Sequence, residues 1–251
     1  MSIIDVIHSM YSGTRSAVKL STGVTDTFAH TVGLKQGCPL SPLLFNVYVN
    51  DLEQFLNNEG HHGITIGNKH ISSILFADDV LILANNANDL QYLIDRLVTF
   101  SLQWGLVINT EETEVMIFNK AGRLLEEHFT CGTTQLKTVD KFIYLGIVFV
   151  PSGIFVPTQT RLTQRANTAL YMIKKGLLRN RDVSIKPATA LKLFDAYVKP
   201  ILIYNCEIWA PSGLRNRSTV DPHTFNLINL NTTEAVHTHF CKYILGLSEQ
   251  S

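Results

Sequence analysis

Two adjacent aspartates interrupt a long apolar segment of the chain. Asp78 and Asp79 follow the run Ile74-Leu75-Phe76-Ala77 and precede the run Val80-Leu81-Ile82-Leu83-Ala84. Each run is short and rich in bulky or β-branched residues, which predicts two buried strands joined at the acidic pair. Like charges this close repel one another unless a cation lies between them, and hard divalent cations prefer oxygen ligands. The pair therefore predicts a metal site or a solvated aspartate turn, and taken alone it does not choose between them.

Three further blocks accompany the acidic doublet in a fixed order. They are residues 33–46 (GLKQGCPLSPLLFN), residues 104–109 (WGLVIN) and Tyr144-Leu145-Gly146. In this order and spacing the four blocks resemble the palm of reverse transcriptases, most closely those of non-LTR (LINE-type) retrotransposons. The resemblance covers residues 1–150 strongly. It extends more weakly over residues 157–247, through Leu191-Lys192-Leu193-Phe194, Tyr204 with Trp209, and residues 240–247.

The resemblance implies an α+β fold. The expected architecture is a partial right-hand polymerase palm, with a mixed or antiparallel sheet and helices, followed by a helical thumb-like module. The expected boundaries are a palm and fingers remnant over residues 1–150, a helical thumb-like region over residues 157–205, and a C-terminal connection of a loop and a helix over residues 206–251.

The resemblance also implies a chemistry and its partners. The reaction would be RNA-directed DNA synthesis, a nucleotidyl transfer from a deoxynucleoside triphosphate to a primer 3′-hydroxyl on an RNA template, assisted by two Mg²⁺ ions or alternatively Mn²⁺. No membrane partner is implied. The implied site residues are Asp78 and Asp79 as catalytic metal ligands; Gln36, Gly37, Phe76 and Ala77 as template and nucleotide contacts; and Tyr144, Leu145 and Gly146 as the primer grip.

Two departures from the family pattern predict that the isolated chain is inactive. Glu112 stands where the family's Asn-x-x-Lys-Thr pattern, beginning here at Asn109, has a lysine that meets the incoming triphosphate. A carboxylate there would repel phosphate. The family's first catalytic aspartate lies on a strand before the helix that opens here at Ser2, and Asp5 is no substitute for it. We therefore expect a truncated chain that needs a missing N-terminal palm and fingers segment.

Charge is distributed unevenly along a chain whose formal net charge is zero. Residues 161–199 carry nine lysines and arginines against two aspartates, whereas residues 1–160 carry nine basic and fifteen acidic residues. A basic segment after an acidic one predicts a phosphate-holding surface, and the alternative is a solvated helix face. The residues expected to contact nucleic-acid phosphates are Arg161, Arg165, Lys174, Lys175, Arg179 and Arg181.

Cysteine usage and hydropathy restrict the compartment. The four cysteines, Cys38, Cys131, Cys206 and Cys241, are widely spaced and form no paired motif, which predicts reduced thiols in an intracellular protein without choosing nucleus or cytoplasm. No apolar run reaches the roughly 18 residues of a membrane span. Two alternatives to a polymerase fragment stay open: a non-enzymatic RNA- or DNA-binding remnant, and a truncated reading frame without a stable product.

Capping residues and apolar periodicity predict the local elements. The expected helices cover residues 3–11, capped by Ser2 and Asp5; 41–56, capped by Ser41 and buried; a segment from the cap Asn88 to Gly105; 162–177; a segment from Pro187 to a bend at Pro200; and 236–247. The expected strands cover residues 18–20, 28–32, 64–66, 71–83, 106–108, 115–118 and 142–150.

Overall fold

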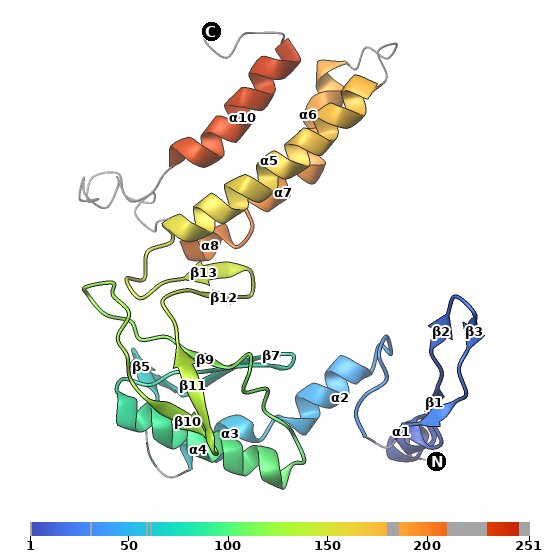
Figure 1. Ribbon diagram of the computed structural model, residues 1–251, viewed down its shortest axis with the longest axis vertical. Helices are drawn as coiled ribbons and strands as arrows, with labels where there is room; N and C mark the ends of the chain where they lie inside the picture. Colours follow the sequence, from blue (N-terminus) through green and yellow to red (C-terminus); the bar gives the residue numbers. More distant parts are fainter. Residues whose placement is uncertain are drawn as a thin grey trace. The chain divides into compact units, whose positions relative to one another are not determined.

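The computed structural model describes residues 2–30, 32–58, 60, 62–179, 186–209 and 230–245. The chain is α+β and divides into two compact units (Figure 1). Unit 1 contains Met1–Asn109 and Thr130–Thr134, and unit 2 contains Thr110–Phe129 and Gln135–Ser251. Each unit is described by itself.

The described residues of unit 1 form short antiparallel hairpins and four helices. Strand β1 pairs with β4, β2 with β3, β5 with β6, and β7 with β8. The elements are α1 (Ile3–Tyr11), β1 (Arg15–Ser16), β2 (Lys19–Leu20), β3 (Gly23–Val24), β4 (Phe28–Ala29), α2 (Ser41–Tyr48), α3 (Leu52–Asn57), β5 (Ile64–Ile66), β6 (Lys69–Ile71), β7 (Ser73–Phe76), β8 (Asp79–Ile82) and α4 (Ala87–Gln103).

The core of unit 1 lies between α3, α4 and the β7–β8 hairpin. Leu52 and Leu56 of α3 pack against Leu93 and Phe100 of α4, and all four side chains are at most 2% exposed. Leu75 of β7 and Ile82 of β8 pack against this cluster. The spacing of the α4 residues places them on one helix face, as their sequence periodicity predicts. One face of the hairpin is therefore fixed to the helical core.

The end of α4 agrees with the sequence prediction, but its start does not. Gly105 follows the C-cap Trp104 with a φ of 61°, the left-handed conformation that commonly ends a helix. The N-cap is Asn86, whose side chain accepts a hydrogen bond from the backbone N–H of Asp89, and the predicted cap Asn88 lies inside the helix. Asn86 and Asn88 both precede the apolar stripe, so the sequence alone did not show which of them is the cap.

The predicted buried helix over residues 41–56 is wrong in two respects. It is two helices, interrupted after Tyr48 because Val49, Asn50 and Asp51 form a tighter turn in which Asn50 N–H bonds to the Val47 carbonyl. The first helix, α2, is also largely exposed: Leu43 is 60% and Val47 67% exposed. Ser41 is its first residue, and the N-cap is Leu40.

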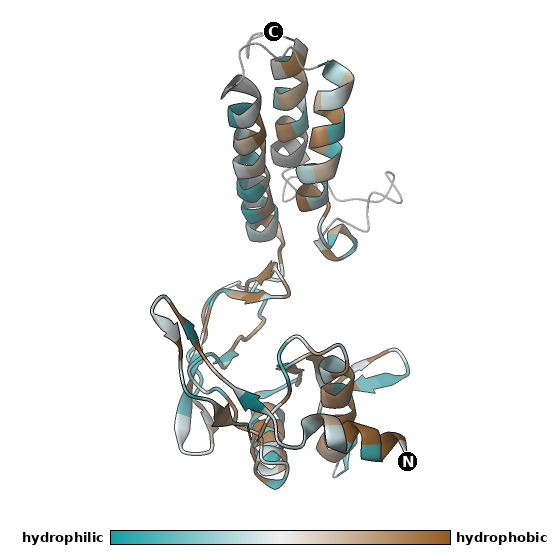
Figure 2. Cartoon of the chain, turned by 90° about the vertical axis from the view of Figure 1, so that its right-hand side faces the viewer, coloured by the Kyte–Doolittle hydropathy of each residue, from teal (hydrophilic) through white to brown (hydrophobic). Residues whose placement is uncertain are grey.

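Helix α1 begins where the sequence predicts. The Ser2 hydroxyl accepts from the Asp5 backbone N–H, and the Asp5 carboxylate accepts from the Ser2 N–H at 2.6 Å. This is the reciprocal capping box expected from the residues. None of the residues of α1 is buried, and Ile3 and Ile4 are 77% and 73% exposed. Its hydrophobic character is visible beside the label N in Figure 2.

Unit 2 combines a β-hairpin with a helical module. Strands β12 and β13 pair antiparallel, with Tyr144 opposite Ile147, and β9 runs parallel to β11. The remaining elements among the described residues are β9 (Glu114–Val115), β10 (Phe129–Cys131), β11 (Thr134–Thr138), β12 (Phe142–Tyr144), β13 (Ile147–Phe149), α5 (Val156–Arg179), α6 (Pro187–Tyr197), α7 (Lys199–Leu202), α8 (Cys206–Trp209) and α10 (Leu230–Leu245).

The helical module has its own core. Residues of α5, α6, α7 and α10 meet there, and Phe194 stacks on Phe240 with ring centroids 4.9 Å apart. The predicted start at Pro187 and bend at Pro200 are confirmed, because α6 ends at Tyr197 and α7 starts at Lys199. The buried members of the cluster are Ala166, Leu170, Ala190, Phe194, Val198, Leu202, Val236 and Phe240.

Several strand predictions need correction. Residues 106–108 form no strand, and Val107 is 95% exposed. Residues 115–118 contribute only Val115, and residues 142–150 form a hairpin. The short strands β1 and β3 were not predicted, since two residues give no alternation to detect. Among the helices that the structure describes, none is both long and apolar enough to cross a membrane.

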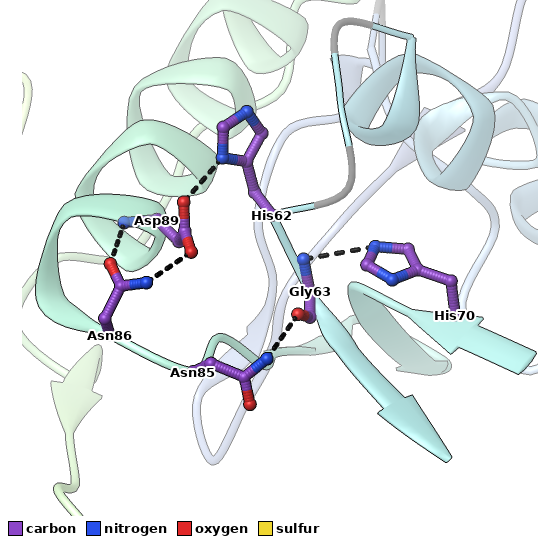
Figure 3. A network of polar contacts seen from close by, with 6 residues as sticks. All are labelled: His62, Gly63, His70, Asn85, Asn86 and Asp89. Atoms are coloured by element: carbon purple, nitrogen blue, oxygen red, sulfur yellow. Dashed lines mark hydrogen bonds and ion pairs between the residues drawn. The ribbon is translucent and has the colours of Figure 1, made fainter. Parts of the chain in front are cut away.

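A polar network ties the start of α4 to the β5–β6 hairpin (Figure 3). The His62 Nδ1 atom lies 2.6 Å from the Asp89 carboxylate, and the His62 ring lies 4.1 Å from that of Tyr92. His70 Nε2 accepts from the Gly63 N–H at 3.1 Å. The hydrogen bond from His62 is the main cause that lowers the pKa of the Asp89 carboxyl, with a smaller contribution from Asn86, while burial opposes it.

This network predicts an acid-sensitive contribution to stability. The pKa of Asp89 is lower in the folded chain, so its stabilising effect is complete above the ordinary carboxyl pKa and disappears as the pH falls through the folded value. We expect Asp89→Asn to destabilise the chain at neutral pH and to differ less from the wild type in acid. Urea unfolding of both chains across this pH range tests the prediction, with the exposed Asp26→Asn as control. A difference that is constant with pH would contradict it.

Candidate functional site

The acidic doublet lies at the tip of the β7–β8 hairpin. Phe76 pairs with Asp79, so Ala77 and Asp78 form a two-residue turn, and Asp79 begins β8. This confirms that the doublet stands where one strand ends and the next begins. Ala77 has a φ of 51°. A non-glycine residue in this conformation is uncommon and costs roughly 1–2 kcal/mol. Ala77 is therefore a strained residue directly before the two carboxylates.

The prediction that both strands are buried is wrong for one face of the hairpin. Phe76 is 58% exposed and Ile74, on the same face of β7, is 44% exposed. Side chains alternate between the faces of a strand, and the α3–α4 core covers only the face that carries Leu75 and Ile82. Asp78 and Asp79 are both exposed. Phe76 therefore lies in the open on the strand next to Asp79, where it can touch a ligand.

The donor set of the doublet fits a divalent cation only in part. Carboxylate oxygens are the ligands that Mg²⁺ prefers, and two adjacent carboxylates can supply one side of an octahedral shell. Within the described part of the chain, no three histidine, cysteine, aspartate or glutamate side chains gather into a metal-ligand group. The remaining ligands would have to be water, substrate oxygens or a further carboxylate. The doublet could thus supply only part of the ligand shell of a cation.

The loop with Gln36 and Gly37 is anchored to the end of α1. The Lys35 ammonium donates to the Met10 carbonyl and lies 5.4 Å from the Tyr11 ring centroid. The Ser41 hydroxyl donates to the Lys35 carbonyl at 2.8 Å. Gly37 has a φ of 80°, and a Cβ there would meet nothing within 4 Å. These contacts hold Gln36 and Gly37 exposed, with backbone open to approach.

Cys38 beside this loop is a feature that the sequence patterns did not single out. The backbone N–H of Leu40 lowers the pKa of the Cys38 thiol, burial opposes this effect, and the Ser41 hydroxyl adds to it. Thiolates are favoured next to backbone N–H groups at the start of a helix. The only sequence signal was a cysteine shortly before Pro42, which is too weak to have identified the effect.

The predicted primer-grip residues form a second tight turn. Tyr144 ends β12, and Leu145 and Gly146 connect it to β13 with φ values of 46° and 82°. Two positive φ values are typical of a type I′ hairpin turn. Glycine suits the second position, and leucine is strained in the first. All three residues are partly exposed.

The predicted phosphate contacts do not share one surface. At roughly 100° per residue, Arg161, Arg165 and Lys175 occupy an arc of about 80° on α5, away from the stripe of Leu162, Ala166 and Leu170. Lys174 points to the other side of that stripe and is half-buried. The side chain of Arg179 and the whole of Arg181 lie outside the described residues. The residues Arg161, Arg165 and Lys175 are hereafter the basic face of α5.

Glu112 lies in an exposed turn of unit 2 beside Glu111. Glu114 begins β9 two residues later and is also exposed. This turn is strongly acidic, so it offers no favourable partner to a triphosphate.

Comparison with known proteins identifies the family. The family model "Reverse transcriptase (RNA-dependent DNA polymerase)" matches residues 2–149, which include the doublet, the Gln36 loop and the Tyr144 turn. The chain belongs to the reverse transcriptase family, and its α+β fold is palm-like over this region. The relatives below place it with the reverse transcriptases of non-LTR retrotransposons.

Three relatives illustrate the similarity. A Pol polyprotein of the type-2 retrotransposable element R2DM from Drosophila melanogaster is 30% identical over 158 residues, 60% of this chain and 15% of that protein. A Pol polyprotein of the element R2 from Popillia japonica is 28% identical over 218 residues, 82% of this chain and 28% of that protein. The RNA-directed DNA polymerase from the mobile element jockey of Drosophila funebris is 22% identical over 213 residues, 82% of this chain and 22% of that protein. The chain thus spans under a third of each of these relatives.

Proposed function

We propose that the chain forms the part of an RNA-directed DNA polymerase that holds a divalent cation, the primer end and the nucleic-acid backbone. The single observation that carries this proposal is the hairpin tip, where the consecutive residues Asp78 and Asp79 are both exposed and Phe76 is open on the neighbouring strand. A cation bound at the doublet would supply Lewis-acid chemistry to the primer 3′-hydroxyl and the departing pyrophosphate. The cation would be Mg²⁺ or Mn²⁺.

The other exposed elements have roles that suit this reaction. The Gln36 side chain carries both a donor and an acceptor for a base edge, and Gly37 lets a base or phosphate approach the backbone. The turn of Tyr144, Leu145 and Gly146 would hold the primer. The helices of residues 157–205 would act as a thumb-like module, with residues 206–251 as a connection. The partners would be an RNA template, a DNA primer and deoxynucleoside triphosphates.

The basic face of α5 is proposed to neutralise phosphates. Arg165 and Lys175 are exposed and Arg161 is half-buried, so at least two of these charges are open to solvent. Each phosphate contact releases counterions, and the logarithm of the binding constant falls with the logarithm of salt concentration by about 0.9 per neutralised phosphate.

Salt dependence tests this surface. In the triple variant Arg161→Ala, Arg165→Ala and Lys175→Ala, we expect weaker binding to a primer–template duplex and a salt slope smaller by roughly two to three. The matched control removes three exposed lysines elsewhere, Lys19, Lys69 and Lys120. The measurement is fluorescence anisotropy at salt concentrations from about 50 to about 200 mM. Equal slopes for the two triple variants would contradict the role of α5.

A second candidate function is nucleic-acid binding without catalysis. Glu112 favours it, because an exposed carboxylate flanked by Glu111 repels a triphosphate but has no such effect on a duplex bound elsewhere. The absence of a third carboxylate near the doublet, within the residues that the structure describes, points the same way. Duplex binding without metal-dependent nucleotide incorporation would distinguish this function from polymerisation.

A further inference from the structure

The Tyr144–Gly146 turn is held by a second strained turn 60 residues away in the sequence. Tyr204 donates its hydroxyl to the Leu145 carbonyl at 3.1 Å, and the Asn205 amide donates to the same carbonyl at 3.4 Å. The Tyr204 ring covers Gly146, where an added Cβ would lie 3.0 Å from ring atom Cε1. Asn205 itself has a φ of 48°. Two turns with left-handed residues thus stabilise one another.

The second turn is anchored in the helical module. Trp209 donates its indole N–H to the Tyr204 carbonyl at 2.7 Å, and its side chain is buried with Ile147 and Leu162. The buried Thr158 hydroxyl of α5 accepts from the Val148 N–H of β13 at 2.9 Å and donates to the Val148 carbonyl at 3.0 Å. The hairpin is therefore bound to α5 on its strand and to the residues between α7 and α8 at its turn.

The hydrogen bonds of Tyr204 and Asn205 to the Leu145 carbonyl, hereafter the tether, stabilise a turn that packing alone would not fix. An isolated two-stranded hairpin is marginally stable in water. A leucine with positive φ raises the cost of this turn further, and the carbonyl of Leu145 would otherwise be free to rotate with the peptide plane. Two donors aimed at one carbonyl fix that plane, and the ring over Gly146 excludes alternative turn conformations.

From these contacts we infer that Tyr204 and Asn205 are positioning residues for the Tyr144–Gly146 turn: they hold it in its binding conformation and make it move with the helical module as one body. The part of this inference that concerns the primer rests on the proposed function. The tether itself rests on contacts within unit 2 alone. The two parts are therefore separable by experiment.

The first measurement tests the tether. Tyr204→Phe removes the hydroxyl and keeps the ring over Gly146, and Tyr197→Phe on α6, where Tyr197 is 62% exposed, is the matched control. In the full chain we expect amide hydrogen exchange of residues 144–147 to accelerate by roughly two- to tenfold in Tyr204→Phe, the range for one lost hydrogen bond. Adding Asn205→Gly, which suits the positive φ, should accelerate it further. Unchanged exchange in both variants would overturn the inference.

The second measurement tests the connection to the primer. Anisotropy compares binding to a duplex with a recessed 3′ end and to the same duplex closed by loops at both ends. We expect the wild type to prefer the recessed end, and the ratio of the two dissociation constants to fall toward one in Tyr204→Phe while binding to the closed duplex is kept. An equal loss for both duplexes, or an unchanged ratio, would overturn the positioning role. A wild type without end preference would overturn the proposed primer-holding function, while the exchange result still decides the tether.

Discussion

The purified 251-residue chain is expected to leave a DNA primer unextended on an RNA template with Mg²⁺ and deoxynucleoside triphosphates. The two carboxylates of the doublet would fill only part of the ligand shell of Mg²⁺, and no metal-ligand group of three side chains occurs in the described ranges of the chain. The family resemblance sets a lysine at the position of Glu112. With a glutamate in place of a lysine, the attraction to a phosphate about 4 Å away becomes a repulsion. The interaction energy then changes by at least roughly 2 kcal/mol, or about thirtyfold in rate or affinity.

Variants show which of these causes dominates. Glu112→Lys removes the repulsion and is expected to strengthen triphosphate binding without producing extension, because the ligand shell is still incomplete. Product formed by the wild-type chain that depends on Mg²⁺ or Mn²⁺ and disappears in Asp78→Ala would contradict the expected inactivity. It would show that other groups complete the ligand shell at the doublet.

Phe240→Ala is expected to destabilise the helical module by about 3–5 kcal/mol. Phe240 is fully buried, and its ring stacks on Phe194 at an interplanar angle of 21°. The alanine loses this contact and leaves a cavity among α5, α6 and α10. Since a domain has only about 5–15 kcal/mol of stability in total, the loss is large. Urea unfolding followed by circular dichroism measures it.

The matched control for this core substitution is Tyr171→Ala. Tyr171 lies on α5 and is 60% exposed, so its replacement should cost less than about 1 kcal/mol. A Phe240→Ala chain as stable as the control would mean that the helices do not pack as described. A wild-type chain without any cooperative unfolding would instead favour the reading frame without a stable product.

Local chemistry made the element types predictable, but it did not show what covers them. The capping box of Ser2 and the terminating Gly105 could be predicted because each depends on residues that are neighbours in the sequence. The exposure of α2 and of Phe76 could not be predicted, because an apolar segment gives the same sequence pattern whether or not a partner covers it. Hydrophobic periodicity specifies a face, and only tertiary packing decides whether that face is buried.

The candidate site divides in the same way. The doublet, the Gln36 loop and the Tyr144 turn were found from short motifs, and the structure places the first two in exposed segments and the third in a partly exposed turn. The contacts of Tyr204 and Asn205 with Leu145 join residues 59 and 60 positions apart, which no local pattern reports. The basic face of α5 could be defined only once the helix was known, because Lys174 adjoins Lys175 in sequence but lies on a different side of the helix.

We claim that Asp78 and Asp79 together hold a divalent cation, and Mn²⁺ binding followed by electron paramagnetic resonance decides it. We expect the wild-type chain to bind Mn²⁺ weakly and Mg²⁺ to compete for the same site. Asp78→Asn and Asp79→Asn should each reduce Mn²⁺ binding at least about tenfold, since each removes a charged ligand worth more than roughly 1.4 kcal/mol. The exposed Asp140→Asn serves as control and should bind as the wild type does. Mn²⁺ binding that is the same in all four chains would contradict the claim.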